Sequence, residues 1–165
     1  MHENFLNLYN ASLKNANALL REAEILFEAE KYARAYALAF TALEEISKSQ
    51  LAADVFTGLI PEADFKGAYR DHRKKIDRMA WATEDAKGYL AMPEEDYLDV
   101  QDVSFANRQS AMYVGFDGGK AISPSEVIGR DQARSVIHTV TVALERIFEV
   151  NEYMGQQIGT KGFMK

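Results

Sequence analysis

The chain has 165 residues and a net charge of −6, from 19 basic and 25 acidic side chains. It contains no cysteine, which excludes disulfides, thiolate metal sites and cysteine nucleophiles, and no apolar run is long enough to span a membrane, so we expect a cytoplasmic protein. The acidic balance argues against diffuse binding to nucleic acid, because such binding gains its affinity by neutralising phosphates.

Two amphipathic helices are expected in the first third of the chain. Residues 5–27 carry apolar side chains along one broad side of a helix. Residues 32–57 are rich in Ala, Leu and Glu, which favour helix, and carry two apolar strips instead of one. Two strips predict a central helix or a helix that also contacts another subunit. Glu44 and Lys48 form an i,i+4 pair beside the second strip.

A third helix is predicted over residues 62–91, and it carries the least ordinary feature of the sequence. His72 lies in the middle of its apolar arc, together with Phe65 and Tyr69, so we expect the imidazole to point into the bundle. From Arg70 to Arg78 there are five basic and two acidic residues, a local charge of +3. Any contact with nucleic acid should therefore be focal.

Residues 92–123 are predicted to be an irregular loop, in which residues 110–116 are a short strand or an extended segment. Such a long loop in a small domain is usually functional or mobile. Ser123 to Glu126 have the pattern of a helix cap, and the last helix is expected over residues 131–154. These elements predict an all-α fold in a single domain, residues 1–165: an antiparallel four-helix bundle with one long irregular loop before the last helix and a flexible tail over about 155–165.

Two interpretations of the His72 region are open. In the first, His72 is an acid or base near neutral pH, and Arg70, Arg73 or Lys75 holds a phosphate. Cleavage of RNA needs those parts and no metal: a base takes the 2′-hydroxyl proton, and cations stabilise the charge that develops at phosphorus. In the second interpretation, His72 is a hydrogen-bonded core residue and the cations are a solvated face.

The polar residues of the second helix leave a similar choice. Glu44, Glu45 and Lys48 are either an ordinary surface ion-pair group or a group that reaches His72 across the bundle and orients a cation. Arg134 and His138 are better interpreted as part of an exposed row with Glu145 than as a second acid–base pair. Neither a bundle metal site nor a glycine-rich phosphate loop is present in the pattern, so we expect no metal and no cofactor.

Three blocks of the sequence resemble the abortive infection protein V (AbiV) family of the HEPN superfamily. The first is residues 32–48, and the second is residues 69–76, in which His72 and Lys75 match the family's His-x-x-Lys. The third is residues 108–114 followed by 122–126. With the first helix, these blocks cover most of the chain.

The resemblance implies an all-α HEPN bundle, commonly a homodimer, that acts in bacterial phage defence. Many HEPN proteins are metal-independent ribonucleases that use an Arg and a His at a wider spacing than this chain offers: one residue separates Arg70 from His72, and three separate Arg134 from His138. A composite site is therefore expected, with a catalytic group of His72, Lys75, Arg73, Glu45 and Lys48 and substrate contacts from Arg70, Glu44, Arg108 and Tyr113.

The predicted function is an effector of phage defence that acts on RNA or translation. RNA, a second copy of the chain, and a phage or antitoxin protein are the expected partners. The alternative is a non-catalytic dimerisation or partner-binding module, in which the polar cluster is structural. The two functions predict different stabilities for variants that lack the cluster. Loss of a structural cluster leaves a buried charge unpaired and destabilises the protein, whereas an active-site group tolerates removal.

Overall fold

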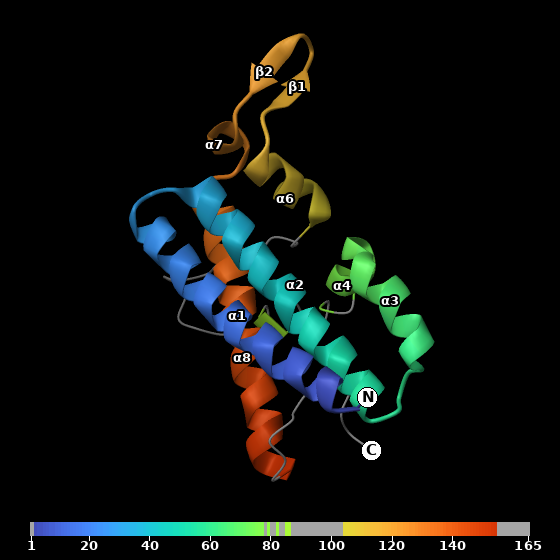
Figure 1. Ribbon diagram of the computed structural model, residues 1–165. Coiled ribbons are helices and arrows are strands. Elements are labelled where there is room, and N and C mark those ends of the chain that lie inside the picture. The colour runs from blue at the N-terminus through green and yellow to red at the C-terminus, as the bar shows by residue number, and fades with distance from the viewer. Residues whose placement is uncertain (1, 78, 80–81, 83–84, 87–103, 155–165) are drawn as a thin grey trace.

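The fold is that of a computed structural model, in which the residues described are 2–77, 79, 82, 85–86 and 104–154. Three long helices pack side by side: α1 (His2–Glu28), α2 (Tyr32–Phe56) and α8 (Arg130–Met154). Figure 1 shows α3 (Glu62–Arg70) and α4 (His72–Asp77) as a pair of shorter helices beside α2, on the other side of it from α1 in this view. The all-α prediction is confirmed.

The second helix lies at the centre of the fold because it is covered on nearly every side. It contacts α1, α8, α3, α4 and α6, and most of its 25 residues are buried. Alanines that are completely buried let the neighbouring helices approach closely, and the large core side chains fill the space between them. The principal core residues are Tyr9, Leu13, Tyr36, Phe40, Leu43, Ile46, Val136, Val140 and Ile147. The two apolar strips of the sequence thus correspond to a central helix.

The prediction of one long third helix is wrong in one respect: the helix is broken at Asp71. This residue has an extended backbone, with φ of −89° and ψ of 105°, and so ends α3. Its carbonyl oxygen accepts a hydrogen bond from the Lys75 amide at 3.1 Å, so Asp71 also begins α4. Aspartate favours this position before a helix, and α3 has no buried residue to hold a continuous helix against the core. Most of residues 78–91 lie outside the described residues.

The predicted irregular loop also needs correction over its second half. Residues 104–122 contain a helix, α6 (Phe105–Met112), and an antiparallel hairpin of β1 (Gly115–Asp117) and β2 (Lys120–Ile122). Ser104 caps α6 by accepting a hydrogen bond from the Asn107 amide at 3.1 Å. Gly118 and Gly119 make the hairpin turn with φ of +55° and +81°, values that glycine adopts without strain. The first half of the loop, residues 92–103, lies outside the described part of the chain.

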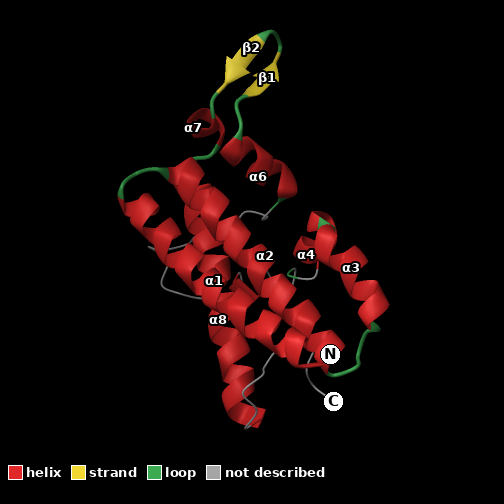
Figure 2. Cartoon of the chain, viewed as in Figure 1, coloured by secondary structure: helices red, strands yellow, loops and turns green. Residues whose placement is uncertain are grey.

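The hairpin stands apart from the bundle. Its two strands are the β-structure found among the described residues (Figure 2). They project beyond α6 and α7 (Pro124–Val127), away from the three long helices (Figure 1). The predicted cap before α7 is present, since the Glu126 carboxylate accepts from the Ser123 amide at 2.6 Å. The hydrogen bonds from the Ser123 backbone and side chain lower the pKa of the Glu126 carboxyl.

Candidate functional site

A buried carboxylate on α2 is the centre of the candidate site. Glu44 is 5 % exposed, in the part of α2 that faces α4. Its Oε1 atom contacts the Nδ1 atom of His72 and lies 3.9 Å from the Nζ atom of Lys75. A carboxylate removed from water is costly unless it is paired, so these two neighbours explain how Glu44 is tolerated beside the core.

Helix α4 brings both partners to Glu44. His72 and Lys75 are three residues apart on one helix, which places their side chains on the same face. The break at Asp71 turns this face toward α2. The Lys75 side chain is 8 % exposed, whereas 45 % of the His72 side chain is exposed. We expected the imidazole to point into the bundle; instead it contacts a buried carboxylate with one nitrogen and is open to solvent over nearly half of its surface.

Helix α6 closes another side of the imidazole. The ring of Phe105 lies 5.8 Å from the His72 ring, centroid to centroid, and the Arg108 guanidinium lies 5.8 Å from the Phe105 ring. The Nε atom of Arg108 is buried and has no hydrogen-bond partner among the described residues. The start of α6 also packs on Tyr36, whose burial raises its pKa to about 12, while the nearby Ser104 backbone and Asn107 side chain oppose this rise. The Tyr36 hydroxyl therefore stays neutral.

Glu45 and Lys48 form a separate contact beside Glu44. The Lys48 ammonium pairs with Glu45, three residues before it, and not with Glu44 as the i,i+4 spacing predicted. It also lies 5.5 Å from the centre of the Tyr69 ring, which links α2 to α3. The predicted group of acidic and basic side chains thus divides into a buried Glu44–His72–Lys75 cluster and a half-buried Glu45–Lys48–Tyr69 contact.

The other predicted site residues are placed differently. Arg70 is exposed and lines a groove along α3, and Arg108 is half-buried beside Phe105. Tyr113 follows α6 at the base of the hairpin and is 60 % exposed. The side chain of Arg73 lies outside the described residues. Among the described residues, no group of three His, Asp or Glu side chains is arranged as metal ligands.

Sequence reasoning missed several residues of this region. Phe105 lies in the part of the chain predicted to be irregular, so nothing in its pattern placed it at His72. Ser47 and Asp54 are completely buried polar residues of α2, on the same face as Glu44. Their spacing from Glu44, three and ten residues, places all three on one helical face, a signal that the strong apolar strips conceal.

His138 departs from the exposed row that the sequence favoured. It is half-buried, and burial lowers the pKa of its imidazole, as does the nearby Arg134 guanidinium, while the Ala86 backbone and Glu145 oppose the shift. His138 is therefore a packed histidine of α8. Nothing described places it with His72 in one site.

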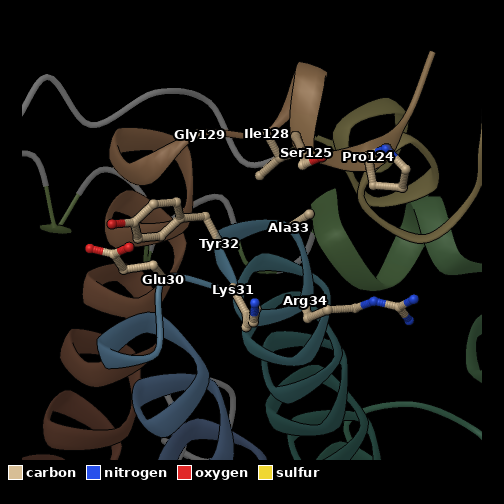
Figure 3. Close-up of a pocket in the computed structure, with 9 residues that line it drawn as sticks. All are labelled: Glu30, Lys31, Tyr32, Ala33, Arg34, Pro124, Ser125, Ile128 and Gly129. Carbon is tan, nitrogen blue, oxygen red and sulfur yellow. The ribbon is translucent and has the colours of Figure 1, made fainter.

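The described surface has cavities at several places. One of about 420 Å³ lies between the α1–α2 turn and α7, as Figure 3 shows, and contains none of the predicted site residues. A second, of about 490 Å³, lies at the end of α2, and a third, of about 330 Å³, is lined by Arg70 and Tyr69. The third cavity is the one that adjoins the candidate site.

Comparison with known proteins agrees with the resemblance of the three blocks. No curated protein and no solved structure matched this chain. The AbiV family of HEPN domains matches residues 4–145, which include α1, α2, the His72–Lys75 pair and most of α8. None of the described helices is long and apolar enough to cross a bilayer. A match over this much of the sequence, on a helical bundle of the expected kind, shows that the chain belongs to the AbiV family of abortive-infection HEPN proteins.

Proposed function

We propose that this protein is a cytoplasmic effector of phage defence that cleaves RNA with His72 as the general base. The observation that carries the proposal is the contact between the buried Glu44 carboxylate and Nδ1 of a solvent-open imidazole. A carboxylate at Nδ1 favours the tautomer with the proton on that nitrogen, which leaves Nε2 as the proton acceptor. This is how a carboxylate orients a catalytic histidine in other hydrolytic sites.

The reaction that fits this arrangement is transesterification at a ribose. Nε2 of His72 takes the proton of the 2′-hydroxyl, and the 2′ oxygen forms a bond to the adjacent phosphorus. The bond from phosphorus to the 5′ oxygen breaks, and that oxygen takes a proton from water. The products are a 2′,3′-cyclic phosphate and a 5′-hydroxyl end, and the proton on His72 returns to solvent.

The cations have different roles in this proposal. Arg70 is exposed, and Arg108 has a buried Nε with no hydrogen-bond partner among the described residues, so these two are suited to a phosphate. Lys75 is too deeply buried to meet substrate directly. We assign it a positioning role: its charge holds the Glu44 carboxylate in place, and Glu44 in turn orients His72. Glu45 and Lys48 support the α3 side of the site through Tyr69.

The test is cleavage of structured RNA by the purified protein in the presence of EDTA, with the end groups of the products identified. His72→Ala should lower the rate by about 10²–10⁴-fold, which is the usual contribution of a general base. The matched control is His138→Gln, which removes a histidine outside the site and should leave the rate unchanged. In cells, His72→Ala should abolish toxicity. Equal cleavage and equal toxicity of the wild-type and His72→Ala proteins would contradict the proposal.

A second candidate function, a dimerisation or partner-binding module, is favoured by the hairpin. Phe116 is 79 % exposed, Val114 is 67 % exposed and Tyr113 is 60 % exposed. An isolated two-stranded hairpin is marginal in water, and clustered exposed apolar side chains usually mark an interface. HEPN domains commonly dimerise, so a second copy is the first partner to test; a phage or antitoxin protein is the other.

Sedimentation of the purified chain tests whether the hairpin is the interface between two copies. Serine at Phe116 and Val114 should convert a dimer to a monomer. The matched control is Ile25→Ser, because Ile25 is similarly exposed, at 68 %, but belongs to α1 and not to the hairpin, so its loss should leave the dimer intact. A monomeric wild-type protein, or a hairpin variant that remains dimeric, would refute the hairpin as the interface between copies.

A further inference from the structure

A groove with aromatic walls runs along α3 next to the candidate site. It has a volume of about 330 Å³ and is lined by Phe5, Glu62, Phe65, Lys66, Tyr69 and Arg70. The rings of Phe65 and Tyr69 are stacked with centroids 5.4 Å apart and planes 30° apart. Phe5 meets Phe65 edge to face at 5.1 Å. Three rings from two helices therefore form one continuous wall.

This wall is partly exposed. Phe5 and Phe65 are partly buried and pack against the core, as their apolar pattern predicted. Tyr69 belongs to the same apolar arc as Phe65, yet it is 37 % exposed, and α3 has no buried residue. The Tyr69 end of the groove is therefore open to a ligand, while its other two rings are held against the core.

The charges around the groove favour an anionic ligand with flat apolar parts. Lys66 and Arg70 line it, and Glu62 is the one acid among its six lining residues. The Lys48 ammonium lies 5.5 Å from the Tyr69 ring centre, but it pairs with Glu45 and so adds no net charge. The two cations and one acid of the lining leave a net charge of +1, on a chain whose net charge is −6. Aromatic rings interleaved with cations are the arrangement that binds single-stranded nucleic acid, because bases stack on the rings and phosphates meet the cations.

The groove lies next to the candidate site along the chain. Two of its lining residues, Tyr69 and Arg70, are at the end of α3, and α3 contacts α4, which begins at His72. Lys48, which contacts Tyr69, belongs to the same stretch of α2 as Glu44. A strand bound in the groove would therefore extend toward α4.

We propose that this groove is a stacking subsite, in which an unpaired RNA base lies on Tyr69 and holds the neighbouring nucleotide at His72. The inference rests on the proposed action on RNA, and it adds the residues that would bind the strand. Tyr69 and Phe65 bind the base, and Lys66 and Arg70 bind the phosphates. A paired base cannot leave its helix to occupy the groove without unstacking, so duplex RNA should bind less well.

The experiment uses the full-length protein and a short, fluorescent 2′-O-methyl oligoadenylate, with binding measured by anisotropy. The methyl group removes the nucleophile of the proposed cleavage, so binding is measured without reaction. Tyr69→Ala should weaken binding by about 5- to 140-fold, which corresponds to about 1–3 kcal/mol for one stacked base. Tyr69→Trp should restore it, and Tyr69→Leu should not, because leucine replaces the apolar area without the ring.

Two controls separate this inference from the proposed cleavage. Ile25→Ala removes an exposed apolar side chain outside the groove and should leave the affinity unchanged. His72→Ala should lose cleavage and keep oligoadenylate binding. A wild-type protein that cleaves RNA but binds the oligonucleotide no better than Tyr69→Ala does would overturn the subsite and leave the cleavage proposal standing. A protein that binds through Tyr69 but never cleaves would overturn the cleavage and leave the subsite standing.

Two further outcomes would also count against the subsite. Equal affinity of Tyr69→Leu and wild type would show an apolar groove, which suits a peptide and not a base. Equal affinity for the single strand and for a duplex of the same sequence would show binding to the backbone alone. Thermal unfolding of Tyr69→Ala is the check that the variant is folded, and Tyr69→Trp keeps the test decisive if it is not.

Discussion

The buried cluster makes a specific prediction about stability, because its three members differ in exposure. Side-chain exposure is 6 % for Glu44 and 8 % for Lys75, but 45 % for His72. Replacing Glu44 by Gln leaves the Lys75 ammonium buried without its carboxylate. Replacing His72 by Ala removes a side chain that is open to water, so the charges that remain are still paired.

The magnitudes follow from this difference. Breaking a buried ion pair costs about 3–5 kcal/mol, but the Lys75–Glu44 separation of 3.9 Å is loose, so we expect about 2–3 kcal/mol for Glu44→Gln. In a domain of this size that lowers Tm by about 4–12 °C. His72→Ala should cost no more than about 1 kcal/mol, as for other partly exposed pairs. The double variant Glu44→Gln, Lys75→Met should recover about 1 kcal/mol or more relative to Glu44→Gln, because it removes the unpaired charge.

Thermal and urea unfolding of the four proteins measures these differences. The control is Lys120→Gln, since the ion pair of Lys120 with Glu126 is mostly exposed, with the two side chains 77 % and 49 % exposed, and its loss should leave Tm unchanged. If His72→Ala lowers Tm as much as Glu44→Gln does, the imidazole is part of the architecture. If Lys75→Met adds to the loss from Glu44→Gln, the two side chains are not coupled, and the explanation of why Glu44 can be buried fails.

Three other predictions concern residues outside the buried cluster. The pKa of His138 is lowered in the folded protein, so its contribution to stability is complete above the unfolded pKa of about 6.5 and is lost as pH falls below that value. As pH is lowered, the urea midpoint should therefore fall more steeply for wild type than for His138→Gln. Ser104→Ala should cost about 1 kcal/mol by removing the cap of α6, and Ser104→Asp should cost less, as denaturation would show. Gly119→Ala should loosen the hairpin, because φ there is +81°, and faster amide exchange within β1 and β2 would report it.

The long helices were predictable because their signals are local and agree with each other. The apolar positions of α1 and α8 repeat at the helical period, and α2 adds high helix propensity. Two apolar strips predicted either a central helix or a helix that also contacts another subunit, and the burial of most residues of α2 within one chain fits the first. The cap from Ser123 to Glu126 was predictable for the same reason, since its residue types bond within four positions.

The break at Asp71 was not predictable, because a helical period runs through it. The apolar arc that includes Phe65, Tyr69 and His72 assumes one straight helix, and the structure divides it between α3 and α4. Whether such an arc is buried depends on tertiary packing, which the pattern does not contain. The same holds for Phe105: its contact with His72 joins segments that are far apart in the chain.

The distribution of burial has a consequence for how the site would work. Glu44 is on the helix that the core holds on nearly every side, so its carboxylate is fixed before any ligand binds. Tyr69 and Arg70 lie on α3, which has no buried residue, and His72 begins α4, which contacts α2, α3 and α6. A ligand that stacks on Tyr69 would therefore act on the less buried side of the site, next to the imidazole that faces the fixed acid. In such an arrangement, the contact that binds the strand also sets the orientation of the base, so weakening the groove should lower the rate of cleavage as well as the affinity for RNA.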